Sequence, residues 1–156
     1  MSDQYLTFTV DKQAYGIQIS AIREINRISE ITKVPEAPAH VAGVMNLRGK
    51  VIPVIEMRLR MKLSAGDITK ETCTIVVETK AGQVGVIVDS VSSVLSLNDK
   101  DIDQTPISQG ESTYIVGVGK LEGSMIMLID IEKCLGAEAE ASYGRQAADS
   151  EVAAAA

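Results

Sequence analysis

One stretch of the sequence has the residue types of a phosphate-binding loop. It runs from Gly43 to Lys50 and reads Gly-Val-Met-Asn-Leu-Arg-Gly-Lys. A phosphate-binding loop needs four residues between its two glycines, and a Ser or Thr after the lysine to bind magnesium. In this chain five residues separate Gly43 from Gly49, and Val51 follows the lysine. The stretch therefore lacks both the spacing and the hydroxyl that phosphate chemistry requires.

Two other patterns are incomplete versions of ligand-binding motifs. The Gly117–Gly119 segment begins a dinucleotide-binding pattern, but Glu122 occupies the place of the third glycine. Asp99, Asp101 and Asp103 alternate as in a calcium loop, without the Gly and Glu that should follow. The single histidine excludes a histidine-rich metal site, and no Gly-x-Ser-x-Gly nucleophile motif occurs. The sequence predicts a protein without catalytic machinery, metal or cofactor.

The composition also narrows the classes of partner. A chain of 156 residues fits one compact domain or two small ones that share a core. Hydrophobic residues make up 46% of it and aromatic residues only 3%, so the core must be aliphatic. The net charge of −6 has the wrong sign for neutralising phosphates, so we expect no nucleic-acid partner. No apolar run approaches the roughly 20 residues of a membrane-spanning helix, and no signal peptide is evident, so we expect a cytoplasmic protein without membrane insertion.

The stretch that fails as a phosphate loop is typical of a β-hairpin. Apolar runs at residues 41–47 and 51–57 flank the polar turn Arg48-Gly49-Lys50, in which Gly49 can adopt a positive φ. Pro53 has no N–H to donate, which predicts that it lies on a strand edge or at a bulge. A charged turn at the tip of a rigid hairpin is suited to contact with another protein.

The hairpin sequence recurs later in the chain. Residues 41–56 align without a gap with residues 115–130, at an offset of 74. Residues 15–25 align with residues 84–94, at an offset of 69. Two blocks in the same order in both halves predict two related β modules in one chain.

Glycine and polar turns divide the rest of the sequence into short strands with little helix. This pattern favours small barrels or a sandwich. The expected strands are residues 4–10, 14–19, 72–79, 83–90 and 91–97, followed by a second hairpin over 114–129. A short C-terminal helix is expected from residue 131, and the Ala-rich residues 141–156 are expected to form a frayed or disordered tail.

These blocks, taken together, resemble a known family. Residues 43–58 are similar to the signature of the CheW family of bacterial chemotaxis coupling proteins. Residues 15–25, 84–91 and 114–119 match the same family in the same order. Glu56 and Met57 stand where Asp-Leu is common, a mild departure.

The resemblance implies a mainly β fold of two interlocked five-stranded, SH3-like β-barrel subdomains around a shared aliphatic core. It implies a CheW-like domain over residues 1–140. The first barrel is expected roughly over residues 14–66 and the second roughly over 72–130, with the N- and C-terminal segments crossing over.

The resemblance also implies a non-enzymatic adaptor. Its partners would be the histidine kinase CheA, which carries a domain similar to CheW, and the cytoplasmic tips of chemoreceptors. A CheW-like scaffold of a different array, such as one controlling surface motility, is the alternative. A small-barrel nucleic-acid binder would need an aromatic and basic face, which the composition opposes. A small-molecule-binding or catalytic barrel would need a convergent polar pocket, which the sequence does not reveal.

By position within the family pattern, five residues are expected to serve receptor binding. Arg48 and Glu24 are expected to form an ion pair that fixes the hairpin turn beside a receptor groove. The apolar floor of that groove would be Ile22, Gly43 and Val44, which would receive a receptor helix.

Four residues of the second module are expected to face the kinase. Glycines among them would allow close backbone approach between strand edges. The second turn has Glu122 where the first has Arg48, so the two turns are expected to meet different partners. The four residues are Gly85, Val91, Val94 and Gly117.

Overall fold

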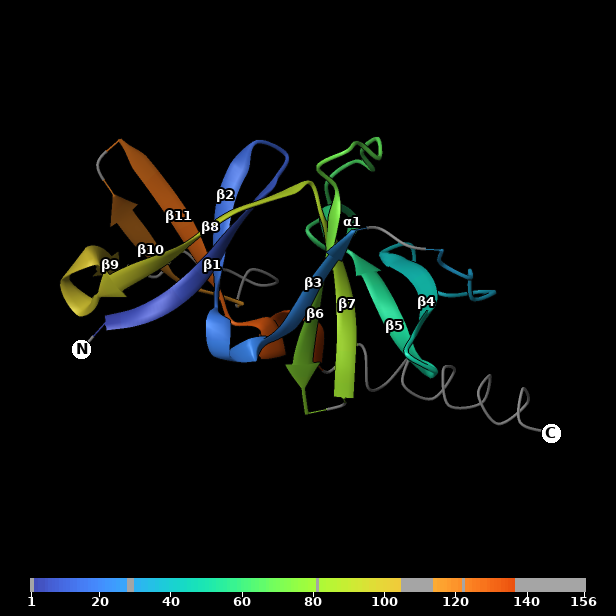
Figure 1. Ribbon diagram of the computed structural model, residues 1–156. Coiled ribbons are helices and arrows are strands. Elements are labelled where there is room, and N and C mark those ends of the chain that lie inside the picture. Colours follow the sequence, from blue (N-terminus) through green and yellow to red (C-terminus); the bar gives the residue numbers. More distant parts are fainter. Residues whose placement is uncertain (1, 28–29, 81, 105–113, 122, 137–156) are drawn as a thin grey trace.

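A computed structural model describes residues 2–27, 30–80, 82–104, 114–121 and 123–136, and shows two β-sheets side by side (Figure 1). One sheet has six strands and the other has five. In spatial order the six are β8 (Ser90–Asn98), β1 (Ser2–Val10), β2 (Gln13–Gln18), β11 (Ser124–Ile129), β10 (Ile115–Leu121) and β9 (Ile102–Asp103). The five are β3 (Ile22–Arg27), β6 (Cys73–Thr79), β7 (Gly82–Val88), β5 (Lys50–Glu56) and β4 (Val41–Leu47).

Helical structure is limited to short segments among the described residues. They are a 3₁₀ turn (Ile19–Ala21), α1 (Met57–Arg60), a second 3₁₀ turn (Asp99–Asp101) and a π-helical turn (Glu132–Gly136). The mainly β fold and the short C-terminal helix are therefore confirmed. The Ala-rich segment 141–156 lies outside the described residues.

The chain crosses twice between the sheets, and each crossing follows a hairpin. The β1–β2 hairpin belongs to the six-stranded sheet, and the next strand, β3, belongs to the five-stranded one. The β6–β7 hairpin belongs to the five-stranded sheet, and β8 then crosses to the six-stranded one (Figure 1). Each repeat thus places its first hairpin in the sheet of the other. The sheets are interlocked as predicted, but they do not follow the boundaries 14–66 and 72–130, because alignment of the repeats does not show which sheet a hairpin joins.

The strand registers reproduce the repeat seen in the sequence. The β4–β5 and β10–β11 hairpins each contain a register shift near the start of their first strand. β5 pairs in parallel with β7 through Val54 and Gly85. β11 pairs in parallel with β2 through Leu128 and Gly16, which are the equivalent positions. The two sheets are therefore pseudo-symmetric versions of one unit.

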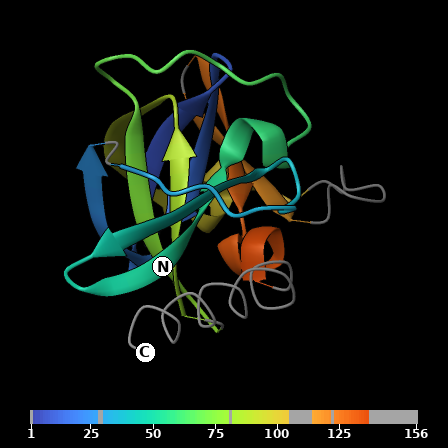
Figure 2. The same cartoon turned by 90° about the vertical axis from the view of Figure 1, so that its right-hand side faces the viewer.

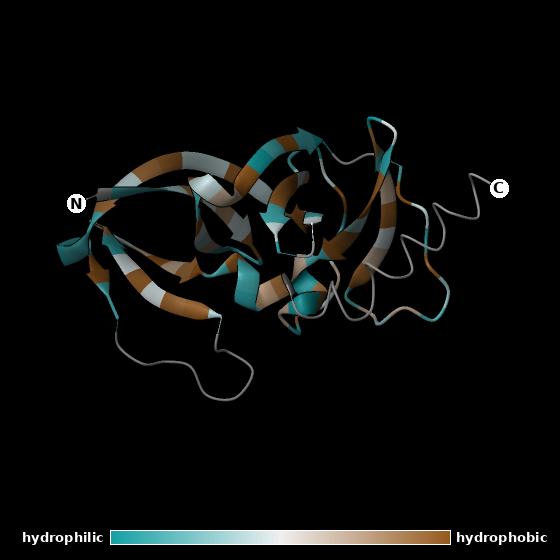
Figure 3. Cartoon of the chain, turned by 90° about the horizontal axis from the view of Figure 1, so that it is seen from below, coloured by the Kyte–Doolittle hydropathy of each residue, from teal (hydrophilic) through white to brown (hydrophobic). Residues whose placement is uncertain are grey.

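The core consists of one central cluster and one smaller cluster within each sheet. The alternating pleat of a strand such as β6 decides which cluster a side chain joins: Ile75 and Val77 enter the central cluster, and Val76 enters that of the five-stranded sheet. Strands buried on both faces have continuous apolar sequences rather than alternating ones. Figure 3 shows these hydrophobic stretches along the strands of both sheets. The central cluster, which includes Phe8 and Ile55, draws on both sheets and is almost entirely aliphatic, as predicted.

The prediction that Pro53 lies on a strand edge or at a bulge is wrong. Pro53 lies in β5, which has neighbours on both sides, and it is paired with Val44 of β4. The backbone N–H and C=O of Val44 bond to Thr32 instead, at 2.8 Å each, so they point away from Pro53. The described pairing of β5 with β7 begins one residue later, at Val54. The missing N–H of Pro53 therefore breaks no described strand pairing.

An ion-pair cluster fixes the crossing from β7 to β8. Arg58 of α1 donates two hydrogen bonds to the carboxylate of Asp89, at 2.8 and 2.6 Å. Asp89 also accepts the N–H of Asp11, at the tip of the β1–β2 hairpin, and its own N–H donates to Thr9. The hydrogen bonds from Arg58 lower the pKa of the Asp89 carboxyl below its usual value. The cluster joins α1, the crossing and the tip of the exchanged hairpin.

Asp89→Asn is expected to destabilise the fold in a pH-dependent way. Because the folded-state pKa is lowered, the carboxylate stabilises the fold above its unfolded pKa, and this contribution is lost as pH falls through the folded pKa. The variant should therefore be less stable than the wild type at pH 7, with the difference shrinking below about pH 4. Urea unfolding across this range measures it, with Asp67→Asn as the charge-matched control. A deficit that does not change with pH would contradict the assignment.

Candidate functional site

Arg48 and Glu24 form the ion pair that was expected at the first hairpin turn. The guanidinium Nη1 donates to Glu24 Oε2 at 2.6 Å, and Nη2 donates to Oε1 at 3.3 Å. Asn26 adds a third hydrogen bond, from Nδ2 to Oε1 at 2.7 Å. The hydrogen bonds from Asn26 and then Arg48 lower the pKa of the Glu24 carboxyl. The Arg48 side chain remains 76% exposed and that of Glu24 only 21%, so the guanidinium is held in place yet open to a partner.

The local sequence explains how the turn presents Arg48. Arg48 and Gly49 both have positive φ, 54° and 85°, as a two-residue hairpin turn between Leu47 and Lys50 requires. The N–H of Gly49 donates to Asn46 Oδ1 at 2.7 Å, which closes the turn. The turn is therefore rigid before any partner arrives.

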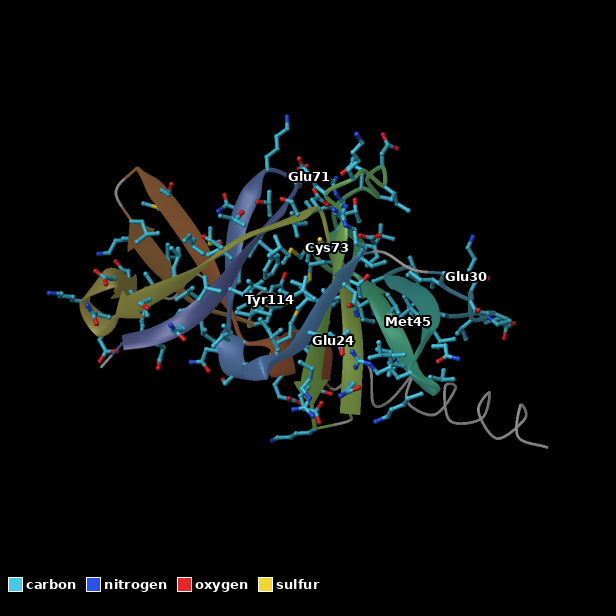
Figure 4. The ribbon with its side chains drawn as sticks, viewed as in Figure 1. Glu24, Glu30, Met45, Glu71, Cys73 and Tyr114 are labelled. Carbon is cyan, nitrogen blue, oxygen red and sulfur yellow. The ribbon has the colours of Figure 1, made fainter. Side chains whose placement is uncertain are left out.

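The ion pair connects opposite edges of the five-stranded sheet. β3, which carries Glu24, is at one edge, and β4, which precedes Arg48, is at the other. Figure 4 labels Glu24 on β3, and Figure 2 shows the β4–β5 hairpin from its own side. Since the side chains meet, the sheet must curl until its edges approach. The small cluster that includes Met45 and Ile52 belongs to this curled sheet.

The three residues expected to form the apolar floor of a receptor groove are all at least partly buried. Gly43 is buried, with a φ of 144°, and a Cβ added to it would lie 2.1 Å from the carbonyl oxygen of Thr32. Val44 is half-buried and its backbone is bonded to Thr32. Ile22 is partly buried and packs against the central cluster. The segment around Thr32 covers Gly43, so this glycine is explained by close backbone approach and offers no open surface to a receptor.

The outer face of β3 carries residues that the sequence did not single out. Ile25 is 42% exposed, and its neighbours Arg23 and Arg27 are exposed on the same face because strand side chains alternate. Asn26 completes the Glu24 network from the other face. The period-2 pattern of residues 22–27 is the signal that could have identified them.

The residues expected to face the kinase divide into two kinds. Gly85 is buried beside Thr74, and Gly117 is buried beside Ile102 of β9, so neither offers a contact surface. Close packing within their own sheets accounts for both glycines, and their assignment to the kinase stays a prediction. Val91 packs against the central cluster from a partly buried position. Val94 is 46% exposed on β8.

Comparison with known proteins identifies the family. The family model of the CheW-like domain matches residues 4–139. The chain belongs to the CheW family. It is 36% identical over 137 residues to "Chemotaxis protein CheW" of Rhizobium meliloti, covering 86% of this chain and 88% of that protein. It is 35% identical over 142 residues to "Chemotaxis protein CheW" of Klebsiella aerogenes, covering 88% and 84%.

A solved structure supports the same conclusion for the fold. The crystal structure of the scaffolding protein TtCheW from Thermoanaerobacter tengcongensis superposes with a TM-score of 0.79 at 30% identity. The match covers 86% of this chain and 92% of that protein. The two-sheet arrangement is therefore that of a solved CheW protein.

The described part of this CheW-family chain has neither a metal-binding cluster nor a membrane-spanning helix. The described residues contain no group of three or more His, Cys, Asp or Glu side chains placed to hold a metal ion. They also contain no helix of the length and apolar character needed to cross a bilayer. The described surface has a charged turn at Arg48 and two strand edges, β3 and β8, that could contact another protein.

Gly43→Ala tests whether this glycine is a structural requirement. The added methyl would collide with the carbonyl of Thr32 and would force an unfavourable φ, so we expect a loss of about 3 kcal/mol in the free energy of unfolding. Gly49→Ala imposes a strained φ with nothing within 4 Å of the new methyl, and should cost about 1 kcal/mol. Urea denaturation of both variants measures the difference. Equal losses of stability in the two variants would show that contact with the Thr32 carbonyl is not the reason for a glycine at position 43.

Proposed function

We propose that this CheW-family protein is an adaptor that couples chemoreceptor tips to the histidine kinase CheA in a chemotaxis signalling complex in the cytoplasm. The observation that carries the proposal is a family fold with two unlike exposed edges, one on each sheet. An adaptor performs no bond-making, and its effect comes from raising the effective concentration of its partners and from favouring one of their conformations.

The receptor surface is proposed to be the outer side of β3 together with the β4–β5 turn. Arg48, held by Glu24 and Asn26, supplies a fixed and largely exposed guanidinium. Ile25, exposed on the outer face of the same strand, supplies an apolar contact. Charged and apolar side chains along one strand edge suit an amphipathic receptor helix.

The kinase surface is proposed to be the edge of β8. Among the described strands β8 pairs only with β1, so its other side is open. Residues 90–98 contain no charged side chain, which is unusual for an exposed edge and favours pairing with a partner strand. Val94 provides the exposed apolar contact there.

Arg48→Glu is expected to leave the fold intact and abolish kinase activation in a reconstituted receptor–CheA assay. The substitution places a second carboxylate beside Glu24 and reverses the charge at the proposed contact. Lys12→Glu, at the tip of the β1–β2 hairpin, is the charge-matched control and should activate normally. The double variant Arg48→Glu with Glu24→Arg should regain part of the activity, because it restores the pair that holds the turn. Full activation by a folded Arg48→Glu protein would show that this turn is not part of the receptor-binding surface.

Val94→Lys is expected to weaken binding to CheA by about tenfold, as truncation of a central contact does. Ile25→Lys is the matched control, since Ile25 occupies the equivalent position on β3 and has nearly the same exposure, 42% against 46%. Calorimetric titration of each variant with purified CheA measures the effect. Equal loss in both variants, or none in either, would contradict the assignment of β8 to the kinase.

A further inference from the structure

A short extended segment covers the outer edge of the second hairpin in each half of the fold. In the five-stranded sheet, Thr32 forms an isolated bridge with Val44 of β4. In the six-stranded sheet, Asp103 of β9 pairs with Val118 of β10. Val118 lies 74 residues after Val44, which is the offset of the hairpin repeat, and Asp103 lies 71 residues after Thr32. The two covering segments therefore occupy equivalent places.

Each covering segment places an isoleucine over a buried glycine. The residue before each bridge is Ile31 in one half and Ile102 in the other. A Cβ built on Gly43 would lie 3.0 Å from Cγ2 of Ile31, and one built on Gly117 would lie 2.9 Å from Cγ2 of Ile102. Both isoleucines pack against the small apolar cluster of their own sheet. The bare glycine thus lets the segment lie close to the strand that it covers.

The segment on β4 is attached by few contacts. We call residues 30–34 the strap; Figure 2 shows the connection that contains it, in light blue, beside the β4–β5 hairpin. The N–H of Thr32 donates to the carbonyl of Val44, and the N–H of Val44 donates to the carbonyl of Thr32, at 2.8 Å each. Ile31 and Val34 are partly buried, and the other three residues of the strap are exposed. A segment with so little buried surface opens more readily than the sheet beneath it.

The equivalent segment in the other half is held more firmly. β9 forms two residue pairs with β10, where the strap forms one bridge with β4. The 3₁₀ turn that leads into β9 is fixed by the carboxylate of Asp101, which accepts the N–H of Asn98 at 3.0 Å. The same edge is therefore covered in both halves, but with unequal firmness.

We propose that the strap opens independently of the rest of the fold, and that the open state offers the edge of β4 to an extended segment of a partner protein. Opening leaves the N–H and the carbonyl of Val44 without their bonds to Thr32, ready for another backbone. The strap itself shows what this edge accepts, an antiparallel segment with an isoleucine over Gly43. The partner segment is therefore a strand with an aliphatic residue in the place of Ile31.

The edge of β4 belongs to neither surface assigned above, which are β3 with the β4–β5 turn and the edge of β8. The strap and an incoming strand compete for Val44, so the free energy of opening lowers the apparent affinity of the partner. A partner bound there would hold the strap open. The test of this strap gives a result whether or not the adaptor assignment holds.

Native-state hydrogen exchange of the full-length ¹⁵N-labelled protein, followed by NMR in low concentrations of urea, tests the opening. After correction for intrinsic rates, the amides of Thr32 and Val44 should exchange at least about tenfold faster than that of Met45, with little dependence on urea. Met45 is the next residue of β4 and pairs with Ile52 of β5. Exchange at Val44 that is as slow as at Met45, with the same urea dependence, would overturn the proposal.

Ile129→Val tests whether the opening is independent of the core. Ile129 lies in the central cluster, and its truncation should speed exchange at Val76, in the middle of the five-stranded sheet, by about fivefold. Exchange at Thr32 and Val44 should not change, because their opening leaves the central cluster intact. Equal acceleration at Val44 and Val76 would show that the strap opens only when the whole protein unfolds, and would overturn the proposal.

A peptide with the sequence of residues 30–36, N-acetyl-Glu-Ile-Thr-Lys-Val-Pro-Glu-amide, tests the edge itself. It should shift the Val44 amide, and should bind Ile31→Ala about fivefold more tightly than the wild type, because that variant opens more often. Ile68→Ala, which truncates an isoleucine that is 68% exposed, is the matched control and should bind as the wild type does.

Exchanging Ile and Thr in the peptide moves the apolar side chain to the other face of the strand, and should weaken binding at least about fivefold. Equal binding of the two peptides, or no shift of the Val44 amide in Ile31→Ala, would overturn the proposal. So would dimerisation of Ile31→Ala without peptide, which would make a second copy of this chain the occupant.

Discussion

The exchange of hairpins between the two repeats is the constraint on which the rest of the structure depends. Neither sheet is complete without a hairpin from the other half, and the central aliphatic cluster lies where the halves meet. The side chains of Arg58 and Glu132 bond the tips of the exchanged hairpins or the crossing beside them. A displacement of one sheet must therefore disturb the core of the other. Close-packed cores respond to such displacement by switching between arrangements rather than by deforming smoothly.

This constraint bears directly on an adaptor. Binding surfaces on independent domains would be connected only by a linker, whereas the surfaces proposed for receptor and kinase lie on two sheets that pack against one central core. Ile22 and Val91 occupy equivalent positions on β3 and β8, and both pack against the central cluster. Each strand thus has both an exposed apolar residue, Ile25 or Val94, and a residue that packs against the common core. A partner bound at one edge can bias the packing that supports the other edge.

The sequence predicted the features that are local, and it missed those that depend on which segments meet. The hairpin around Gly49, the repeat and the Arg48–Glu24 pair follow from turn chemistry, alignment and family pattern, and the structure contains all three. The family resemblance implied that the subdomains interlock, but the residues alone do not show which hairpins are exchanged, because a strand's own sequence does not identify its neighbours. Glycines that were expected at partner surfaces, such as Gly85, are closely packed inside the sheets. The sequence alone does not distinguish a glycine needed for internal packing from one needed at a binding surface.

The two open edges differ in a way that follows from the cost of leaving a strand unpaired. Natural proteins protect exposed strand edges with charges, and β3 has Arg23, Glu24 and Arg27 along six residues. β8 has none along nine residues. The two strands are equivalent in the repeat, so fold alone does not explain the contrast. An edge without charges has less protection against pairing with another backbone, whereas a charged edge can stay in water and use its side chains for recognition. The charge pattern of the edges is therefore consistent with a partner strand on β8 and a side-chain contact on β3.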